Sequence, residues 1–423
     1  MKSNASRFYA GDVLYGRLRP YLNKVAQPNF DGLASAEFIV FPNNQLLQTD
    51  FLKYRLNALD FVRFSSHLNE GDRPRVSFDQ IGNFQLLIPP IKEQSRIVAK
   101  IEELFSELDK GIESLKTARE QLKIYRQAVL KHAFEGKLTA QWREEHKNNL
   151  EIADELLVHI KRERDNQIKK FGKTRVKNPR EFTDENFDWL SDLPDEWGWE
   201  RLGWITCGVE YGTSAKSREI GDIPVLRMGN IQNMRFDWAD LVYTSNKEEI
   251  EKYLLQAGDV LFNRTNSPEL VGKTALYRGE KPAIFAGYLI RINHLDGMVD
   301  SQYLNLFLNS HIAKQYGNRV KTDGVNQSNI NGEKLINYPF PYCTLEEQKQ
   351  VVAILDERLS VIDQTENDIL YQLQKAEALR QSILKRAFSG KLVAQNPNDE
   401  PASVLLERIK GEKDDSKKKR NVA

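Results

Sequence analysis

The chain has 423 residues, 40% hydrophobic and 29% charged, with a formal net charge of +1, so its overall charge gives no argument for nucleic-acid binding. Two cysteines, Cys207 and Cys343, without a CxxC pair, exclude a disulfide framework and argue against a zinc site. The N-terminus shows no signal peptide, and no run approaches about 18 apolar residues, so we expect a cytoplasmic chain without membrane contact.

Residues 1–88 predict a mixed α+β region that begins abruptly. Ala10-Gly-Asp-Val-Leu14 echoes Ala257-Gly-Asp-Val-Leu261, which stands far along a later domain, so the counterpart of about 193–256 is absent. Three explanations stay open: a start codon further upstream, a natural truncation or recombination product, or a missing part supplied by another chain. Without that part, the region would expose strand edges and part of its core.

Two long segments, 92–134 and 345–388, each predict one continuous helix. Their apolar residues alternate three- and four-residue steps, which is the seam of a coiled coil, and Gly136 and Gly390 supply C-terminal stops. Each helix is about 60 Å long and needs an equally long partner, so we expect an antiparallel coiled coil between them. The predicted seam comprises Ile97, Ile101, Leu104, Leu108, Ile112, Leu115, Leu122, Tyr125, Leu355, Leu359, Ile362, Ile369, Leu373 and Ile383.

The segments between and after the helices differ in character. A lysine-rich connector is helical over about 150–170, and a charged tail ends in Lys417-Lys-Lys-Arg420. Residues 193–342 predict a complete α+β domain, with β-like runs and helical pieces punctuated by Gly and Asn. The predicted divisions are a partial domain, a helix, a linker with a short helix, a complete domain, a second helix, and a short helix with the tail: 1–88, 89–142, 143–192, 193–342, 343–395 and 396–423.

The chain repeats itself at the two long helices. Glu93-Gln94 recurs 254 positions later as Glu347-Gln348. One constant offset through the whole helix means that neither copy carries an insertion, as expected of a rigid element. The same offset relates Lys131 to Lys385, Ala133-Phe134 to Ala387-Phe388, and Gly136-Lys-Leu138 to Gly390-Lys-Leu392.

This pattern resembles a known family. Ile88-Pro-Pro-Ile91 leads into the first helix, which ends in Leu130-Lys-His-Ala-Phe-Glu-Gly-Lys-Leu138, and Leu384-Lys-Arg-Ala-Phe-Ser-Gly-Lys-Leu392 ends the second. Leu193-Pro-Asp-Glu-Trp197 opens the later domain, and Arg17-Leu-Arg-Pro-Tyr-Leu22 continues the first. Together these motifs resemble the specificity (S) subunits of type I restriction-modification systems, over nearly the whole chain.

The resemblance implies an α+β chain with two target recognition domains, the first N-terminally truncated, joined by the coiled coil. Each domain would read half of a bipartite site in double-stranded DNA. The implied partners are two methyltransferase (M) subunits, which bind S-adenosylmethionine and methylate adenine, and restriction/translocase (R) subunits. ATP and Mg are expected on those partners, and no cofactor on this chain.

The residues agree with a non-catalytic role. We find no Gly-x-x-x-x-Gly-Lys-Ser/Thr phosphate loop, no Asn-Pro-Pro-aromatic methyltransferase motif, and no cluster suited to a metal nuclease. Three alternatives stay open: a truncated subunit that assembles but reads only a half-site, a structural coiled-coil protein, and an enzyme with a fused nuclease or methyltransferase.

Candidate DNA contacts are cations for phosphates, and forked or amide side chains for base edges. They cluster in predicted loops, where ordinary turn chemistry is the alternative for each. In the later domain they are Lys216, Arg218, Arg227, Asn230, Gln232, Asn233, Arg264, Asn266, Lys321, Asn326 and Gln327, and in the first region Arg17, Arg19, Arg73 and Arg75.

Overall fold

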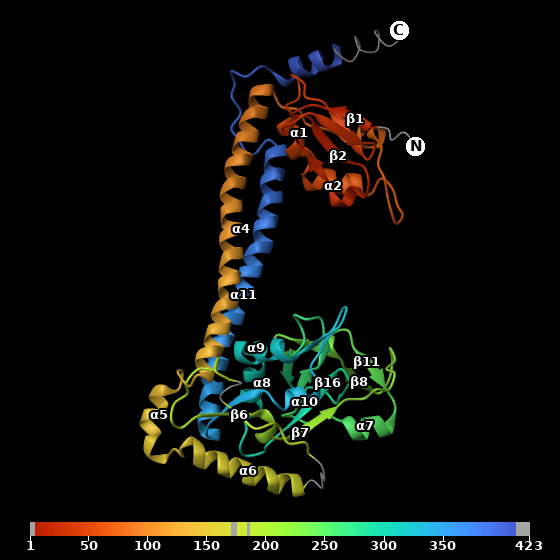
Figure 1. Ribbon diagram of the computed structural model, residues 1–423. Helices are drawn as coiled ribbons and strands as arrows, with labels where there is room; N and C mark the ends of the chain where they lie inside the picture. The colour runs from red at the N-terminus through yellow and green to blue at the C-terminus, as the bar shows by residue number, and fades with distance from the viewer. Residues whose placement is uncertain (1–4, 171–175, 184–186, 412–423) are drawn as a thin grey trace. The chain divides into compact units, whose positions relative to one another are not determined.

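The computed structural model describes residues 5–170, 176–183 and 187–411, so the predicted Lys417–Arg420 tail lies outside the described residues. The chain forms two compact units, the first made of 1–119 with 366–423 and the second of 120–365 (Figure 1). Below, the first region means the part of the first unit up to residue 88, and the second region means residues 193–342.

The first region combines two small antiparallel sheets with three short helices. One sheet pairs β1 with β4, and the other has the order β3-β2-β5. Val13 and Tyr15 on β2 and Phe61 on α2 lie at the centre of its apolar core. The elements are β1 (Ala5–Phe8), β2 (Val13–Gly16), η1 (Pro20–Leu22), β3 (Val25–Ala26), β4 (Gly32–Ser35), β5 (Phe38–Phe41), α1 (Thr49–Leu56), α2 (Leu59–Ser66) and α3 (Phe78–Ile81).

The second region is larger and more fully paired. Its main sheet has the order β14-β12-β16-β7, and smaller sheets are β11-β8-β15, β13-β18-β17, β19-β6 and β10-β9. The strands are β6 (Gly198–Arg201), β7 (Thr206–Tyr211), β8 (Ile223–Leu226), β9 (Ile231–Gln232), β10 (Arg235–Phe236), β11 (Val242–Thr244), β12 (Val260–Asn263), β13 (Thr265–Asn266), β14 (Thr274–Leu276), β15 (Ile284–Phe285), β16 (Leu289–His294), β17 (Thr322–Asp323), β18 (Ser328–Asn329) and β19 (Pro339–Tyr342).

Helices pack on these sheets and connect them. Within the second unit, Phe134 at the end of the first long helix lies 5.2 Å from both Tyr303 and Phe307 on α8, measured between ring centroids, so that helix end belongs to the core of the second region. The helices here are α5 (Ala140–His146), η2 (Lys147–Asn149), α6 (Ala153–Lys170), η4 (Leu202–Trp204), η5 (Met228–Asn230), α7 (Lys247–Tyr253), α8 (Ser301–Leu308), α9 (His311–Val320) and α10 (Gly332–Leu335). The mixed α+β content predicted from sequence is confirmed.

The long helices α4 (Ile91–Phe134) and α11 (Leu345–Phe388) pack antiparallel, as predicted (Figure 1). In the first unit Ile97 and Ile101 near the start of α4 share a core with Ile383 near the end of α11. In the second unit Val129 near the end of α4 shares a core with Leu355 near the start of α11.

Both long helices end in the same way. Gly136 and Gly390 each have a φ of +68°, in the left-handed region that glycine adopts without strain. The following amide bonds back five residues, from Lys137 to His132 at 3.0 Å and from Lys391 to Arg386 at 2.9 Å. These are C-terminal caps of the Schellman type, which explains the repeated Gly-Lys-Leu.

The predicted seam side chains lie between or partly between the helices. None of the predicted positions on either helix is exposed apart from Tyr125, whose exposed fraction is 53%. The prediction that Tyr125 lies in the seam is therefore wrong. Tyr125 borders a groove beside Val361 and Ile362 of α11, while Leu122 and Val129 on either side of it are less exposed.

The repeated Gln94 and Gln348 perform the same structural task. The Gln94 carbonyl oxygen accepts the amide of Gln48, the N-cap residue of α1, at 3.0 Å. Equivalently, the Gln348 carbonyl oxygen accepts the amide of Asp300, the N-cap residue of α8, at 2.9 Å. Each glutamine is buried and satisfies a helix-start amide that would otherwise lack an acceptor.

Candidate nucleic-acid interface

Segment 286–288 forms backbone hydrogen bonds to the residues at the ends of three strands of the second region. Ala286 donates its amide to Leu226 at the end of β8 at 2.9 Å, and Gly287 donates to Thr213 beyond β7 at 2.7 Å. The amide of Arg264, directly after β12, donates to the Tyr288 carbonyl at 3.0 Å. We call the surface formed by 213–218, 264–273, 286–288 and 321–330 the loop edge of the second region.

Arg264 lies within this edge and is held by it. Its Nη1 donates to the Gly287 carbonyl at 3.1 Å, and its guanidinium lies 5.1 Å from the centroid of the Tyr211 ring. The Nε atom is buried and has no hydrogen-bond partner among the described residues. Most of the guanidinium therefore faces the protein.

The hairpin of β17 and β18 carries the amide candidates of this edge. β18 pairs with β13, which contains Asn266, and the Asn266 side chain accepts the amide of Ser267 at 2.8 Å. Asn326 and Gln327 lie exposed at the hairpin tip. Lys321 enters the hairpin and donates to the Pro268 carbonyl at 3.2 Å, so its ammonium is partly used within the protein.

Some of the candidate DNA contacts in and after the turn that follows β8 are buried, and others are exposed. Asn230 is buried, and its side chain accepts the Arg227 amide at 2.9 Å and donates to the carbonyls of Asp237 and Ala239 at 3.1 Å each. Arg227 itself donates to the Asp240 carbonyl at 2.9 Å. Asn230 thus holds the turn.

Gln232 and Asn233 lie exposed on the β9–β10 hairpin that follows this turn. Gln232 donates to the Gly229 carbonyl at 3.0 Å, and Asn233 has a φ of +48°, as two-residue hairpin turns require.

Lys216 and Arg218 are both exposed on the segment that follows β7. Arg218 exchanges backbone hydrogen bonds with Tyr243, at 2.9 and 2.7 Å, which fixes the path of the segment without using either cationic side chain. Since an exposed ammonium or guanidinium keeps its donors available, these two residues suit phosphate contact.

In the first region Arg17 and Arg19 follow β2. The Arg17 Nε donates to the Val76 carbonyl at 3.0 Å and its Nη1 to the Ala36 carbonyl at 3.3 Å. Arg19 has a φ of +53° and a buried Nε without a hydrogen-bond partner among the described residues.

Arg73 and Arg75 lie on the segment before α3, at the same edge of the first region. Arg73 is exposed, whereas Arg75 forms an ion pair with Glu37 at 2.6 Å. A backbone bridge between Leu18 and Arg75 joins this segment to the residues that follow β2.

Lys273 at the loop edge and Lys314 on α9 were not among the predicted contacts. Burial lowers the pKa of Lys273, and loss of hydration together with the nearby Lys273 lowers the pKa of Lys314. Among the described residues neither ammonium forms an ion pair, and the effect of Lys273 on the pKa of Lys314 requires the two charges to be near each other. Lys314 stands on α9, 41 positions from Lys273, so no local motif could have linked them.

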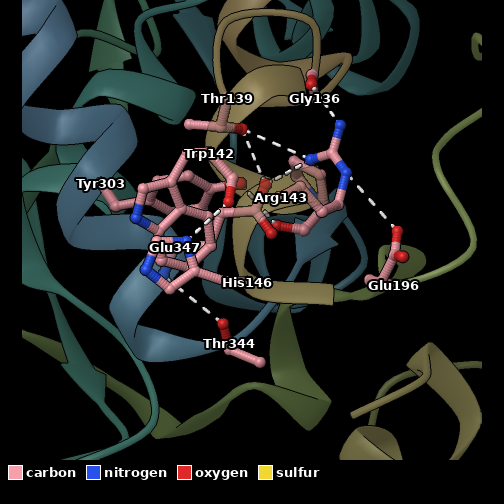
Figure 2. A network of polar contacts seen from close by, with 10 residues as sticks. Gly136, Thr139, Trp142, Arg143, His146, Glu196, Tyr303, Thr344 and Glu347 are labelled. Atoms are coloured by element: carbon pink, nitrogen blue, oxygen red, sulfur yellow. Dashed lines mark hydrogen bonds and ion pairs between the residues drawn. The ribbon is translucent and has the colours of Figure 1, made fainter. Parts of the chain in front are cut away.

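A buried ion pair ties the long helices to the opening of the second region (Figure 2). Arg143 on α5 pairs with Glu347 at the start of α11, lies 3.4 Å from Glu196, and donates to the Gly136 carbonyl at 2.7 Å. Thr139 donates to the same Glu347 oxygen at 2.7 Å. This network joins parts of the second unit that lie 204 residues apart in sequence.

Within the parts of the chain that the structure describes, no group of three or more His, Cys, Asp or Glu side chains is placed to hold a metal ion. Both cysteines are buried, and burial raises the pKa of Cys343 well above its usual value. Among the same residues, every helix is too short or too polar to cross a membrane.

A family profile and several known proteins are similar to this chain. The profile of the family described as "Type I restriction modification DNA specificity domain" matches residues 11–118 and 207–375, which is well over half of the chain. The type I restriction enzyme EcoKI specificity subunit of Escherichia coli K12 is 27% identical over 91% of this chain and 74% of its own length. A putative type I restriction enzyme MjaX specificity subunit of Methanocaldococcus jannaschii is 29% identical, but the match covers 49% of each chain.

Solved structures share the fold. A chain from a structural study of complex assembly and conformational transition of the type I R-M system has a TM-score of 0.67 at 21% identity, covering 93% of this chain and 85% of that one. The HsdS subunit from Thermoanaerobacter tengcongensis has a TM-score of 0.50 at 21% identity, with 91% and 82% covered. From the profile match, this chain belongs to the family of type I restriction-modification DNA specificity subunits.

Proposed function

We propose that this chain is a non-catalytic subunit that reads a bipartite sequence in double-stranded DNA for a type I restriction-modification complex. The observation that carries this proposal is that two separate regions of one chain each place an arginine directly after a matching strand, with further candidate DNA contacts around it. In the first region these are Arg17, Arg19, Arg73 and Arg75, and in the second Arg264, Asn266 and Gln327. Two independent readers in one chain suit a target made of two half-sites.

The candidates include the two kinds of contact that DNA recognition needs. Exposed cations such as Lys216, Arg218 and Arg73 suit phosphates, whereas exposed amides such as Gln327 and Asn326 suit adenine edges. Lys314 on α9 is exposed, and the charge of Lys273 lowers its pKa, so it adds a further cation that suits phosphate contact.

The coiled coil supports docking of two methyltransferase subunits. In the second unit Tyr125 and Val361 are exposed and line a groove of about 420 Å³. In the first unit Leu370, Tyr371 and Leu379 are exposed on α11. Exposed apolar side chains that line a groove mark an interaction site, and the second unit has such a groove at Tyr125 and Val361. The partners would supply the chemistry: S-adenosylmethionine on the methyltransferases, and ATP and Mg on the restriction subunits.

The test is to co-express the chain with its cognate methyltransferase subunit and map methylated adenines across the host DNA. A two-part motif is the expected result. A half-motif or a symmetric motif would mean that only one region reads DNA. No motif from a stable complex would leave a subunit that assembles without reading, and no complex at all would leave a coiled-coil protein of another role.

Docking has its own test. Tyr125→Ser with Val361→Ser, both on exposed side chains, should weaken methyltransferase binding in size-exclusion chromatography while the chain stays folded. Ile220→Ser, at an exposed side chain of the second region, is the matched control and should leave the complex intact.

A further inference from the structure

Arg17 and Arg264 make the same set of contacts in the two regions. Each directly follows the central strand of its sheet, β2 in the first region and β12 in the second. The backbone amide donates to the residue before the next strand of the sheet, from Arg17 to Glu37 at 2.8 Å and from Arg264 to Tyr288 at 3.0 Å.

The remaining contacts agree as well. The side-chain Nη1 donates to the carbonyl one residue earlier, from Arg17 to Ala36 at 3.3 Å and from Arg264 to Gly287 at 3.1 Å. The arginine carbonyl accepts the amide just before a short helix, from Val76 at 3.1 Å and from Ile330 at 2.8 Å. In both regions one arginine therefore joins three loops that are far apart in sequence.

We infer that Arg17 and Arg264 are equivalent positioning residues, and that the segments they hold, 35–37 and 286–288, set the sequence preference of the two half-sites. The inference deepens the proposed function and rests on it. In this inference the two arginines hold the loops in place and do not contact bases. Glu37 and Tyr288 join the residues that face the DNA.

The hydrogen bonds commit part of each guanidinium to its own loop. An arginine reads guanine through two parallel N–H donors. In Arg17 both Nε and Nη1 are bound to backbone carbonyls, and in Arg264 the Nε is buried while Nη1 is bound. The N–H groups bound to these carbonyls shape the loops, so a bidentate guanine contact would have to come from the remaining N–H groups on Nη1 and Nη2.

The two held segments present different chemistry. Tyr288 has an exposed fraction of 51%, so its ring and hydroxyl are available. Glu37 lies at the matching position and is held by Arg75 at 2.6 Å. Its Oε1 accepts from Arg75 and its Oε2 is buried without a hydrogen-bond partner among the described residues, whereas the exposed tyrosine offers a donor and an aromatic face. The two half-sites should therefore differ in sequence.

The test uses the complete methyltransferase complex and the methylated motif as readout. Arg264→Met should lower discrimination at least about tenfold at several adjacent positions of one half-site, because the whole segment is released. Arg17→Met should do so at the other half-site. Arg264→Lys keeps one donor for the Gly287 carbonyl and should restore most of the discrimination, which it could not do for a bidentate guanine contact.

Matched controls are Arg278→Met in the second region and Arg63→Met in the first, both at exposed arginines. Tyr288→Ala removes only an exposed side chain, so it should change the preference of the same half-site as Arg264→Met without unfolding the chain. Loss of preference at a single guanine position in Arg264→Met, unrescued by lysine, would overturn the inference, as would an unchanged motif in both Arg264→Met and Tyr288→Ala. A wild-type complex without any motif would overturn the proposed function and the inference together.

Discussion

The first and second regions share the arginine-centred contacts but differ in what surrounds them. In the second region β16 lies between β12 and β7, whereas its counterpart β5 in the first region is the end strand of a three-stranded sheet. Arg17 nevertheless makes the contacts that Arg264 makes. The loop geometry therefore depends on the local strand–loop–helix sequence, and the additional strands of the second region are not needed to form it.

The starts of the two long helices differ in a second way. Glu347 is buried against Arg143 and Thr139, but the positions 254 residues after those two hold Pro397 and Val393. Among the described residues, the carboxylate of Glu93 forms no hydrogen bond and no ion pair. The glutamine contact is thus common to both copies, and the ionic network belongs to the second alone.

The largest expected effect comes from breaking that network. Arg143→Met leaves the Glu347 carboxylate buried without its cation and should lower the unfolding free energy of the second unit by about 3–5 kcal/mol. All six tryptophans lie between 142 and 238, so tryptophan fluorescence in urea reports on this unit. Arg96→Met, which removes a partly exposed pair with Asp399 in the first unit, is the control and should leave that fluorescence transition in place. A loss below about 1 kcal/mol in Arg143→Met would contradict the importance given to the pair.

Replacing the shared glutamines should cost less. Gln348→Ala leaves the Asp300 amide and the carbonyls of Met298 and Cys343 without their partner, for about 1–3 kcal/mol. Gln94→Ala removes two contacts, with Gln48 and Pro89, and should fall toward the lower end of that range. Hydrogen exchange at Asp300 and Gln48 measures the two effects separately. Equal protection in mutant and wild type at either amide would show that the contact does not stabilise that helix start.

Phosphate binding at the lysine pair should appear in the salt dependence of DNA affinity. If Lys314 contacts a phosphate, Lys314→Ala should reduce the slope of log affinity against log salt by about 0.9, for all DNA sequences alike. Lys247→Ala, at an exposed lysine on α7, is the matched control. Salt titrations by fluorescence anisotropy check this, and a change confined to one DNA sequence would instead assign Lys314 to base reading.

The smallest expected effect is a difference in acid sensitivity. Burial by itself would raise the pKa of Glu135, but hydrogen bonds from Lys137 and Ser191 lower it below its usual value. Because the pKa is lower in the folded state, the ionised carboxylate stabilises the fold. This stabilisation is fully present above about pH 4.3, the pKa in the unfolded state, and is lost as the pH falls through the folded-state pKa. Glu135→Gln should therefore flatten the decline in second-unit stability below about pH 4.3.

The first region offers the matching acid test. Burial opposes the charged form of Asp60, yet Arg55, 2.6 Å away, lowers its pKa. Asp60→Asn should flatten the loss of first-unit stability at low pH, which appears in circular dichroism of the whole chain. The tryptophan fluorescence transition, which reports on the second unit, should keep its wild-type pH dependence. A shift of both signals by either substitution would contradict independent contributions from the two units.

Much of the architecture was predictable because it is periodic. The seam of α4 and α11 and the glycine stops follow from spacing alone, and the structure confirms both helices to within one residue at their starts. Tyr125 was misplaced because its spacing fits the seam equally well, and only packing decides which way a ring turns.

The site was predictable only in part. The matching Gly-Asp-Val-Leu motifs before Arg17 and Arg264 were visible in the sequence, but the carbonyls that these arginines bind are set by tertiary structure. Asn230 has the residue type of a base reader, yet its hydrogen bonds are used inside a turn. The Lys273–Lys314 and Arg143–Glu347 pairs join residues with no local sequence relation.

The glutamine contact at the start of each long helix has an evolutionary consequence. Gln94 and Gln348 bind the backbone of the preceding region, at Gln48 and Asp300, and a backbone amide is the same whatever side chain stands there. A gene that exchanged one region for a foreign one at the Glu-Gln codons would keep this joint intact. New target sequences could then arise by recombination without redesign of the helices.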